Sequence, residues 1–126
     1  MKLTSDILVV GGGYYGFSIS GRLDWHVYVI NSGTELAIVD PGCGIDRDFE
    51  KIISNIRDDG LDPNKIKKIF VTHYHFDHIG AAADARSLLD AEMYAAKTVA
   101  FLMMPNPTTA LAPFWEGCWV SRPCLL

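Results

Sequence analysis

The 126-residue sequence predicts an α/β fold in which strands come first and helices then alternate with strands. Two observations carry this prediction. Short apolar, β-branched runs end at glycines or turn residues, as buried strands do. A stripe of apolar residues at helical spacing then follows them. The composition, 49% hydrophobic and 21% charged, excludes a disordered, collagen-like or coiled-coil chain.

Several strands are expected in the first forty residues. Residues 7–10 are apolar and stop at three glycines, and residues 17–20 alternate as a further strand would. Residues 26–30 are β-branched and aromatic, and residues 36–39 are apolar. The turn residues 31–34 lie between these last two runs, which predicts a hairpin.

The second half of the pattern begins with an amphipathic helix. Its apolar positions follow the i, i+3, i+4, i+7 spacing: Phe49, Ile52, Ile53 and Ile56. Asp46 and Asp48 favour its start, and Gly60 favours its end. Asp62 and Pro63 predict a short turn before a strand at 69–71. A helix over 80–86, a strand over 91–95 and a helix over 97–103 complete the order. We therefore expect one unit over residues 1–104 and an irregular tail over 105–126, where prolines interrupt any regular element.

Charge and composition narrow the possible partners. Eleven Lys plus Arg against fifteen Asp plus Glu give a net charge of -4, which does not favour nucleic acid. No apolar run approaches the roughly 20 residues of a membrane helix, and the N-terminus lacks a secretory apolar region. These features predict a soluble, cytoplasmic protein without a membrane partner.

The cysteines are few and odd in number, which argues against a disulfide framework. We expect Cys43 to be a free thiol. Cys118 and Cys124 could pair, although nothing in the sequence requires it. The chain has no Cys-x-x-Cys pair, so a thiolate zinc ribbon is excluded.

A histidine cluster follows the predicted strand at 69–71 directly. It consists of His73, His75, Asp77 and His78, and it holds three of the four histidines of the chain. Imidazole and carboxylate suit zinc and similar divalent ions. In an extended backbone His73, His75 and Asp77 would project to one side, and His78 could serve a second ion if the chain curls there. The remaining histidine, His26, has no nearby ligand partner in the sequence.

The segment Thr72–Gly80 resembles the His-x-His-x-Asp-His signature of the metallo-β-lactamase superfamily. The upstream hairpin and its Asp40-Pro41-Gly42 corner also resemble that family, so the resemblance covers about residues 20–103. It implies half of an αβ/βα sandwich. It also implies a metal-dependent hydrolase, with zinc as the expected metal and iron or manganese as further candidates.

The resemblance also implies residue roles. His73 and His75 would bind a first ion, and Asp77 and His78 would bind a second. Asp77 would be the residue on which catalysis depends. Asp40 would steady the segment that carries these ligands, residues 73–78, which we call the ligand loop, without binding metal itself. The bound ions would lower the pKa of a water and polarise the scissile carbonyl or phosphoryl group.

Part of the family's ligand pattern is missing. No histidine follows His78, and Asp84 and Asp90 lie too close to the motif to be the distant bridging acid. Two protein ligands for each ion are fewer than the three of a typical catalytic zinc site. We therefore expect a fragment, a truncated form or a frame-shifted end, and a sheet face left uncovered for self-association.

A glycine motif offers a different interpretation. Gly11–Gly16 satisfies the G-x-G-x-x-G pattern of dinucleotide-binding domains. About ten residues separate Gly16 from the next strand, which is short for a helical crossover. A glycine-rich turn between two early strands is the simpler interpretation.

Three functional classes stay open from the sequence. The first is a metal-dependent hydrolase of a small-molecule thioester, lactone, β-lactam or phosphodiester. The second is a non-catalytic remnant that binds metal weakly or not at all, and the third is a dinucleotide-binding fragment.

Overall fold

The strands form one five-stranded sheet in the order β1-β2-β3-β4-β5. The structure is a computed structural model that describes residues 1–45 and 48–103. The strands are β1 (Ile7–Gly11), β2 (Val27–Asn31), β3 (Leu36–Val39), β4 (Ile66–Val71) and β5 (Glu92–Ala95). The helices are α1 (Asp48–Asp58), the 3-10 turn η2 (Pro63–Lys65), α2 (Phe76–Ile79), α3 (Ala82–Leu88) and α4 (Lys97–Met103).

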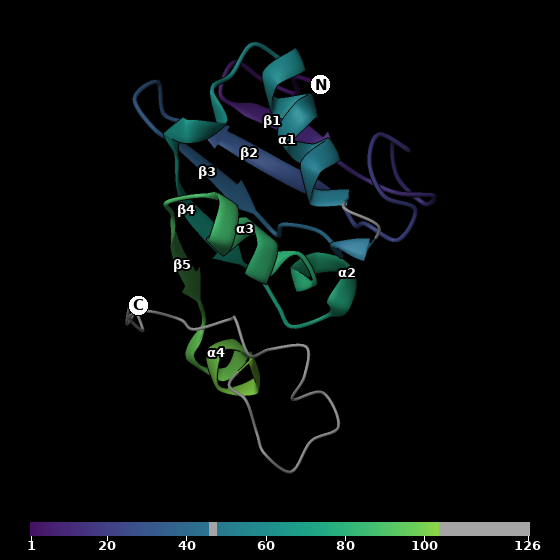
Figure 1. The fold of residues 1–126 in the computed structure, drawn as a ribbon, viewed down its shortest axis with the longest axis vertical. Coiled ribbons are helices and arrows are strands. Elements are labelled where there is room, and N and C mark those ends of the chain that lie inside the picture. Colours follow the sequence, from purple (N-terminus) through teal and green to yellow (C-terminus); the bar gives the residue numbers. More distant parts are fainter. Residues whose placement is uncertain (46–47, 104–126) are drawn as a thin grey trace.

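The sheet changes direction at its centre. β1, β2 and β3 pair antiparallel, and β3, β4 and β5 pair parallel. The connections between the parallel strands carry helices: α1 lies between β3 and β4, and α2 and α3 lie between β4 and β5. Figure 1 shows α1 over β1 and β2, and α3 over β4. The predicted α/β fold and its hairpin at residues 26–39 are therefore confirmed.

One row of side chains crosses all five strands and forms the centre of the core. The strand register aligns Leu8, Val29, Ile38, Ile69 and Met93, which are all buried. The apolar stripe of α1 belongs to the same core: Phe49, Ile52, Ile53 and Ile56 are buried. The helix thus forms where the sequence predicts it, because the buried sheet row gives its apolar stripe a partner.

The opposite face of the sheet carries a second row, which we call the outer ladder. It consists of Val9, Tyr28, Val39, Phe70 and Tyr94 in register. The rings of Phe70 and Tyr94 stack at 5.3 Å, and Phe70 is 38% exposed. Ile30, two residues after Tyr28 and on the same face of β2, is 41% exposed. This face therefore presents apolar side chains that the described residues cover only in part.

The segment 17–20 differs from its prediction, because it forms no strand. It belongs to a loop over residues 12–26 that folds back on itself, with the Ile19 N–H donating to Gly12 O at 2.9 Å. The side-chain amide of Asn55 on α1 donates to the carbonyls of Val10 and Ile19, both at 2.8 Å. The loop thus takes its hydrogen bonds from itself and from α1, and the alternating sequence has no neighbouring strand to pair with.

The loop over residues 12–26 also shows which backbone structure the glycine motif Gly11–Gly16 adopts. Gly11 ends β1, and no helix lies between residues 12 and 26. The sequence Gly11–Gly16 is therefore a strand end followed by a loop. It is not the strand-to-helix turn on which a dinucleotide fingerprint depends.

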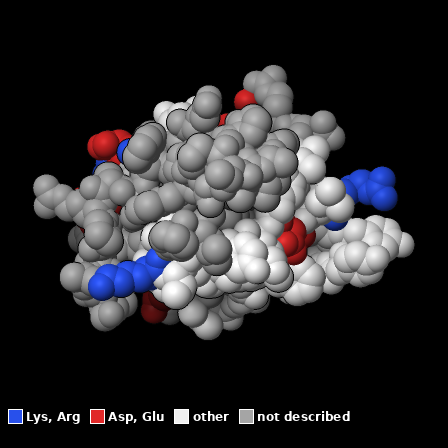
Figure 2. Space-filling model, turned by 90° about the horizontal axis from the view of Figure 1, so that it is seen from below, with Lys and Arg blue, Asp and Glu red and all other residues white. Residues whose placement is uncertain are grey.

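The predicted tail over 105–126, Asp46, Cys118 and Cys124 lie outside the described residues. None of the helices within residues 1–45 and 48–103 is long and apolar enough to cross a membrane. On the face seen in Figure 2, the described surface carries isolated basic and acidic groups rather than a patch of one sign.

Candidate metal centre

The candidate ligands lie at the carboxyl ends of two parallel neighbours, β3 and β4. Asp40 follows β3 directly, and Thr72 follows β4. The Asp40 N–H donates to Phe70 O at 2.9 Å, which continues the pairing past the end of β3. Because the carboxyl ends of parallel strands meet at one edge, residues far apart in the chain come together here.

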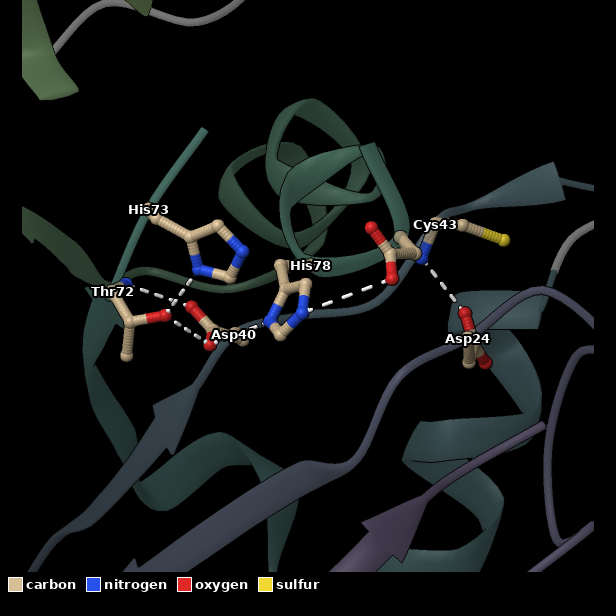
Figure 3. Close-up of polar contacts among 7 residues, drawn as sticks. Asp24, Asp40, Cys43, Thr72, His73 and His78 are labelled. Atoms are coloured by element: carbon tan, nitrogen blue, oxygen red, sulfur yellow. Dashed lines mark hydrogen bonds and ion pairs between the residues drawn. The ribbon is translucent and has the colours of Figure 1, made fainter. Parts of the chain in front are cut away.

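Asp40 is the centre of the hydrogen bonding at this edge (Figure 3). One carboxylate oxygen accepts the Thr72 N–H at 2.8 Å. The other accepts the Thr72 hydroxyl at 2.6 Å and Nδ1 of His78 at 2.9 Å. Asp40 is 5% exposed and has φ of +53°, in the left-handed region that Asp tolerates better than most residues. A buried carboxylate with three donors is well satisfied in this position.

These hydrogen bonds fix the proton positions on two histidines. An ionised carboxylate only accepts, so Nδ1 of His78 must be the donor to Asp40. The Thr72 hydroxyl has one hydrogen, which is directed to Asp40. Nδ1 of His73, which is 2.9 Å from Thr72 Oγ1, must then donate to that oxygen. In the neutral form of each ring the proton is therefore on Nδ1, and the Nε2 lone pair is available to another partner.

The His73 ring and the Asp77 carboxylate both lie near His78. The ring centroids of His73 and His78 are 4.0 Å apart, and Nε2 of His78 is 3.8 Å from Asp77 Oδ2. Asp40, His73 and His78 each offer a ligand atom within 4.8 Å of the others. The ring of His75 is 4.8 Å from that of His73, and His75 is exposed.

The arrangement departs from the extended geometry expected of the motif. The backbone turns into α2 at Phe76, so Asp77 lies in the first turn of a helix, beside His78. His75 precedes the helix and falls outside the closest group of ligand atoms. The curl expected at His78 thus begins two residues earlier, because Phe76–Ile79 already forms a helical turn.

Backbone hydrogen bonds hold the ligand loop from two sides. Gly42 N–H donates to His78 O at 3.0 Å, and Gly42 O accepts the Ala81 N–H at 2.9 Å. Trp25 N–H donates to Asp77 O at 3.1 Å, and the Trp25 ring stacks 5.9 Å from His78. Sequence analysis did not identify Trp25 or Thr72, since neither belongs to the ligand types of the motif.

A second group of possible ligand atoms consists of Asp24, Cys43 and Asp48. The Asp24 carboxylate already accepts hydrogen bonds from Ser20 Oγ at 2.5 Å, Gly21 N at 3.0 Å and Cys43 N at 2.7 Å. Cys43 is buried and free, as predicted, and its side chain points away from His78 in Figure 3. The pKa of the Cys43 thiol is raised from its ordinary 9.0 to about 11, mainly by burial and to a smaller extent by nearby Asp24 and Asp48. The hydrogen bond from Cys43 N to Asp24 joins the segment after β3 to the loop over residues 12–26.

The residues at the sheet edge fit a divalent metal. Two imidazole Nε2 atoms with fixed tautomers and an adjacent carboxylate form a donor set that zinc accepts. Asp40 fits the supporting position, because its oxygens are taken by Thr72 and His78.

The chain matches the metallo-beta-lactamase superfamily model over residues 22–115. The match ends inside the segment 105–126 for which an irregular tail is expected. It spans most of the 126 residues, and it includes the ligand loop and Asp40. The chain therefore belongs to the metallo-beta-lactamase superfamily.

Two curated relatives are similar over part of their length. A hydroxyacylglutathione hydrolase of Tolumonas auensis is 32% identical over 71 residues, which cover 56% of this chain and 25% of that protein. An atrochrysone carboxyl ACP thioesterase of Aspergillus terreus is 31% identical over 84 residues, which cover 66% of this chain and 24% of that protein. The chain thus spans about a quarter of the length of these relatives.

A solved structure shows the same fold. A subclass B3 metallo-beta-lactamase of Bradyrhizobium japonicum is 26% identical with a TM-score of 0.66. That match covers 82% of this chain and 34% of that structure. The five-stranded sheet and its helices therefore correspond to about a third of a metallo-beta-lactamase chain.

Proposed function

We propose that this chain carries the His73, His75, Asp77 and His78 part of a zinc-dependent hydrolase whose substrate is a thioester. The proposal rests on the hydrogen bonds of Asp40, which leave Nε2 of His73 and of His78 available, the latter 3.8 Å from Asp77. The thioester is favoured because the relatives' names specify an acylated glutathione and a thioesterase.

The residues of this chain would have two different roles, binding zinc and orienting the zinc ligands. His73, His75, Asp77 and His78 would hold zinc, and Asp40 with Thr72 would keep the His73 and His78 rings oriented. A bound zinc ion would supply an activated water and polarise the acyl carbonyl. Asp77 is about 40% exposed at its side chain, so its carboxylate borders both the ligand atoms and the solvent from which substrate arrives.

The test begins with metal content. The purified chain is analysed for zinc by plasma emission, together with His73→Ala/His75→Ala and with Tyr74→Ala as the matched control. Tyr74 lies between the two histidines and is 51% exposed, so its removal should leave zinc binding intact. Equal and negligible zinc in all three proteins would refute the metal site.

Turnover is then measured as thiol release from an S-acyl glutathione. We expect slow, zinc-dependent hydrolysis, below about 1 per second, that Asp77→Ala abolishes. The rate should be low because this sequence offers two ligands to each ion where catalytic zinc sites have three.

A second candidate is a metal-binding domain without turnover. The position of His75 favours it, because this side chain is exposed and lies outside the closest group of possible ligand atoms. Bound zinc without zinc-dependent thiol release would support this candidate and would contradict the hydrolase.

A further inference from the structure

A pocket of about 490 Å³ opens beside the candidate metal centre. Its walls come from the loop over residues 12–26, which extends past the end of the sheet on the side of α2 (Figure 1), and from α2 itself. Asp77 of the ligand loop is one of the lining residues, and so is Trp25, whose ring stacks against His78. The volume lies within the range of about 300–1,000 Å³ that small-molecule sites occupy.

The walls are mainly aromatic. Tyr14 and Tyr15 are 70% and 87% exposed, and Trp25 and Phe76 are 46% and 41% exposed. Tyr14 and Tyr15 meet edge to face at 5.3 Å. Single exposed aromatic residues are ordinary, but four around one pocket next to a ligand loop form a surface suited to a flat apolar group.

The loop that carries these rings is held in place. Gly13 N–H donates to Asp24 O at 2.8 Å, and Tyr14 N–H donates to Arg22 O at 3.0 Å. A Cβ at Gly13 would lie 2.3 Å from Arg22 O, so the two arms of the loop pack as closely as only glycine allows. Because the walls are formed before a ligand arrives, binding would cost little ordering of the loop.

Arg22 gives the pocket a charge preference. No ion pair involves its guanidinium within residues 1–45 and 48–103. The lining residue Asp24 is not available to it, because the buried Asp24 carboxylate is taken by Ser20, Gly21 and Cys43. The second acidic lining residue, Asp77, lies against His78 at the candidate metal centre, 3.8 Å from its Nε2. Arg22 is therefore the lining residue that favours a carboxylate on the ligand.

We propose that this pocket binds the acyl part of the substrate, and that this acyl part carries an aromatic group and a carboxylate. The aromatic group lies among Tyr14, Trp25 and Phe76, and the carboxylate pairs with Arg22. This assignment rests on the proposed hydrolase, because the pocket is placed to present an acyl carbonyl at the ligand loop.

The probe for the pocket is 3-phenylpropionate, and its matched neutral control is 3-phenylpropionamide. Both are titrated into the ¹⁵N-labelled chain, with and without zinc, and amide shifts are followed. We expect millimolar binding of the acid with shifts confined to residues 13–26 and 76–77. The neutral amide should bind about fivefold more weakly.

Variants separate the two parts of the pocket. Arg22→Gln should reduce the affinity for the acid to that for the amide and leave the amide unchanged. Phe76→Ala should weaken both probes. Equal binding of acid and amide to the unmodified chain would overturn the role of Arg22, and shifts outside the pocket would overturn its location.

Metal content distinguishes this proposal from the proposed hydrolase. Binding of the acid that needs zinc and persists in Arg22→Gln would mean coordination of the metal and would overturn the pocket assignment. A chain that takes up zinc but shows no pocket shifts loses only the pocket proposal. A chain that binds the acid through Arg22 but takes up no zinc loses the hydrolase and keeps the pocket as a carboxylate site.

Discussion

Nδ1 of His73 lies 2.9 Å from the hydroxyl of Thr72, and that hydroxyl donates its single hydrogen to Asp40. One buried carboxylate therefore sets the tautomer of His78 directly and that of His73 through Thr72. The relay gives Thr72 a function that no ligand pattern would assign to it.

Thr72→Val should weaken zinc binding about 10- to 100-fold, because the His73 ring loses the acceptor that keeps its proton on Nδ1. Thr72→Ser keeps the hydroxyl and should retain most of the affinity. Affinity is measured by competition with a chelator, and ring ¹⁵N shifts of the metal-free protein report the tautomer of His73. A valine variant with unchanged affinity and an unchanged ring spectrum would contradict the relay.

Cys43 should make stability depend on pH in the alkaline range. Its pKa in the folded state is about 11, above the ordinary value of 9.0, because burial disfavours the thiolate. The folded state therefore holds the thiol proton more tightly. The stabilisation is fully present below pH 9 and is lost as the pH rises toward 11, by at most about 2 to 3 kcal/mol.

The measurement uses urea unfolding in a Cys118→Ser/Cys124→Ser background, with and without Cys43→Ala. The free energy of unfolding of the protein that retains Cys43 should fall relative to the alanine variant between pH 9 and 11. The difference should be constant below pH 8. A constant difference across the whole range would show that the buried thiol does not titrate as stated.

The sequence predicted the elements whose stabilising contacts follow a regular period. The apolar stripe of α1 from Phe49 to Ile56 packs against the buried row of the sheet, to which the apolar runs of β1, β3 and β4 contribute. Each of these elements therefore needs only one apolar layer as its partner. The strand predicted over residues 17–20 was wrong, because an alternating apolar and polar pattern alone does not show whether a neighbouring strand exists. Their hydrogen bonds go to Gly12 and to Asn55, and the second contact spans 36 residues.

The same distinction applies to the candidate site. The ligand motif is local and can be read directly, whereas the roles of Thr72, Trp25 and Asp24 depend on contacts with distant segments. Asp24, for example, bonds Cys43 across 19 residues, and Thr72 bonds Asp40 across 32. In the sequence Asp24 has the character of a loop residue, and nothing in its neighbourhood indicates burial.

Gly13→Ala should destabilise the protein by about 3 kcal/mol, because the new Cβ would meet the backbone of Arg22 at 2.3 Å. Gly33→Ala is the matched control. Gly33 has φ of +91° and open space around it, so alanine there costs only the backbone strain of about 1 to 2 kcal/mol. Urea unfolding followed by circular dichroism compares them. Equal costs would mean that the two arms of the loop over residues 12–26 are not in close contact.

The chain should not bind NAD or FAD through Gly11–Gly16. A pyrophosphate site of this kind needs a helix N-terminus after the glycines, and residues 12–26 form a loop. Equilibrium titration with each nucleotide checks this expectation. A Cβ at Gly13 would meet backbone atoms of Arg22, whereas a Cβ at Gly16 would meet only the His26 ring, so Gly16→Ala serves as the milder variant. Micromolar binding that Gly16→Ala abolishes would overturn this view of the motif.

The outer ladder should drive self-association of the chain at high concentration. Phe70 and Ile30 are about 40% exposed on a face whose neighbours Tyr28, Val39 and Tyr94 are half-buried. Two such faces can pack about 10 Å apart, as stacked sheets do, and each buried Å² of apolar surface contributes about 25 cal/mol. Phe70→Lys places a charge in the middle of this face and should shift the chain toward monomer.

Leu88→Lys is the matched control, because Leu88 is 61% exposed on α3, among the helices on the other face of the sheet. Sedimentation velocity over a concentration series measures both variants and the unmodified chain. Association that survives Phe70→Lys, or that Leu88→Lys removes equally well, would place the contact elsewhere, and a chain that stays monomeric throughout would show that this face needs no partner copy.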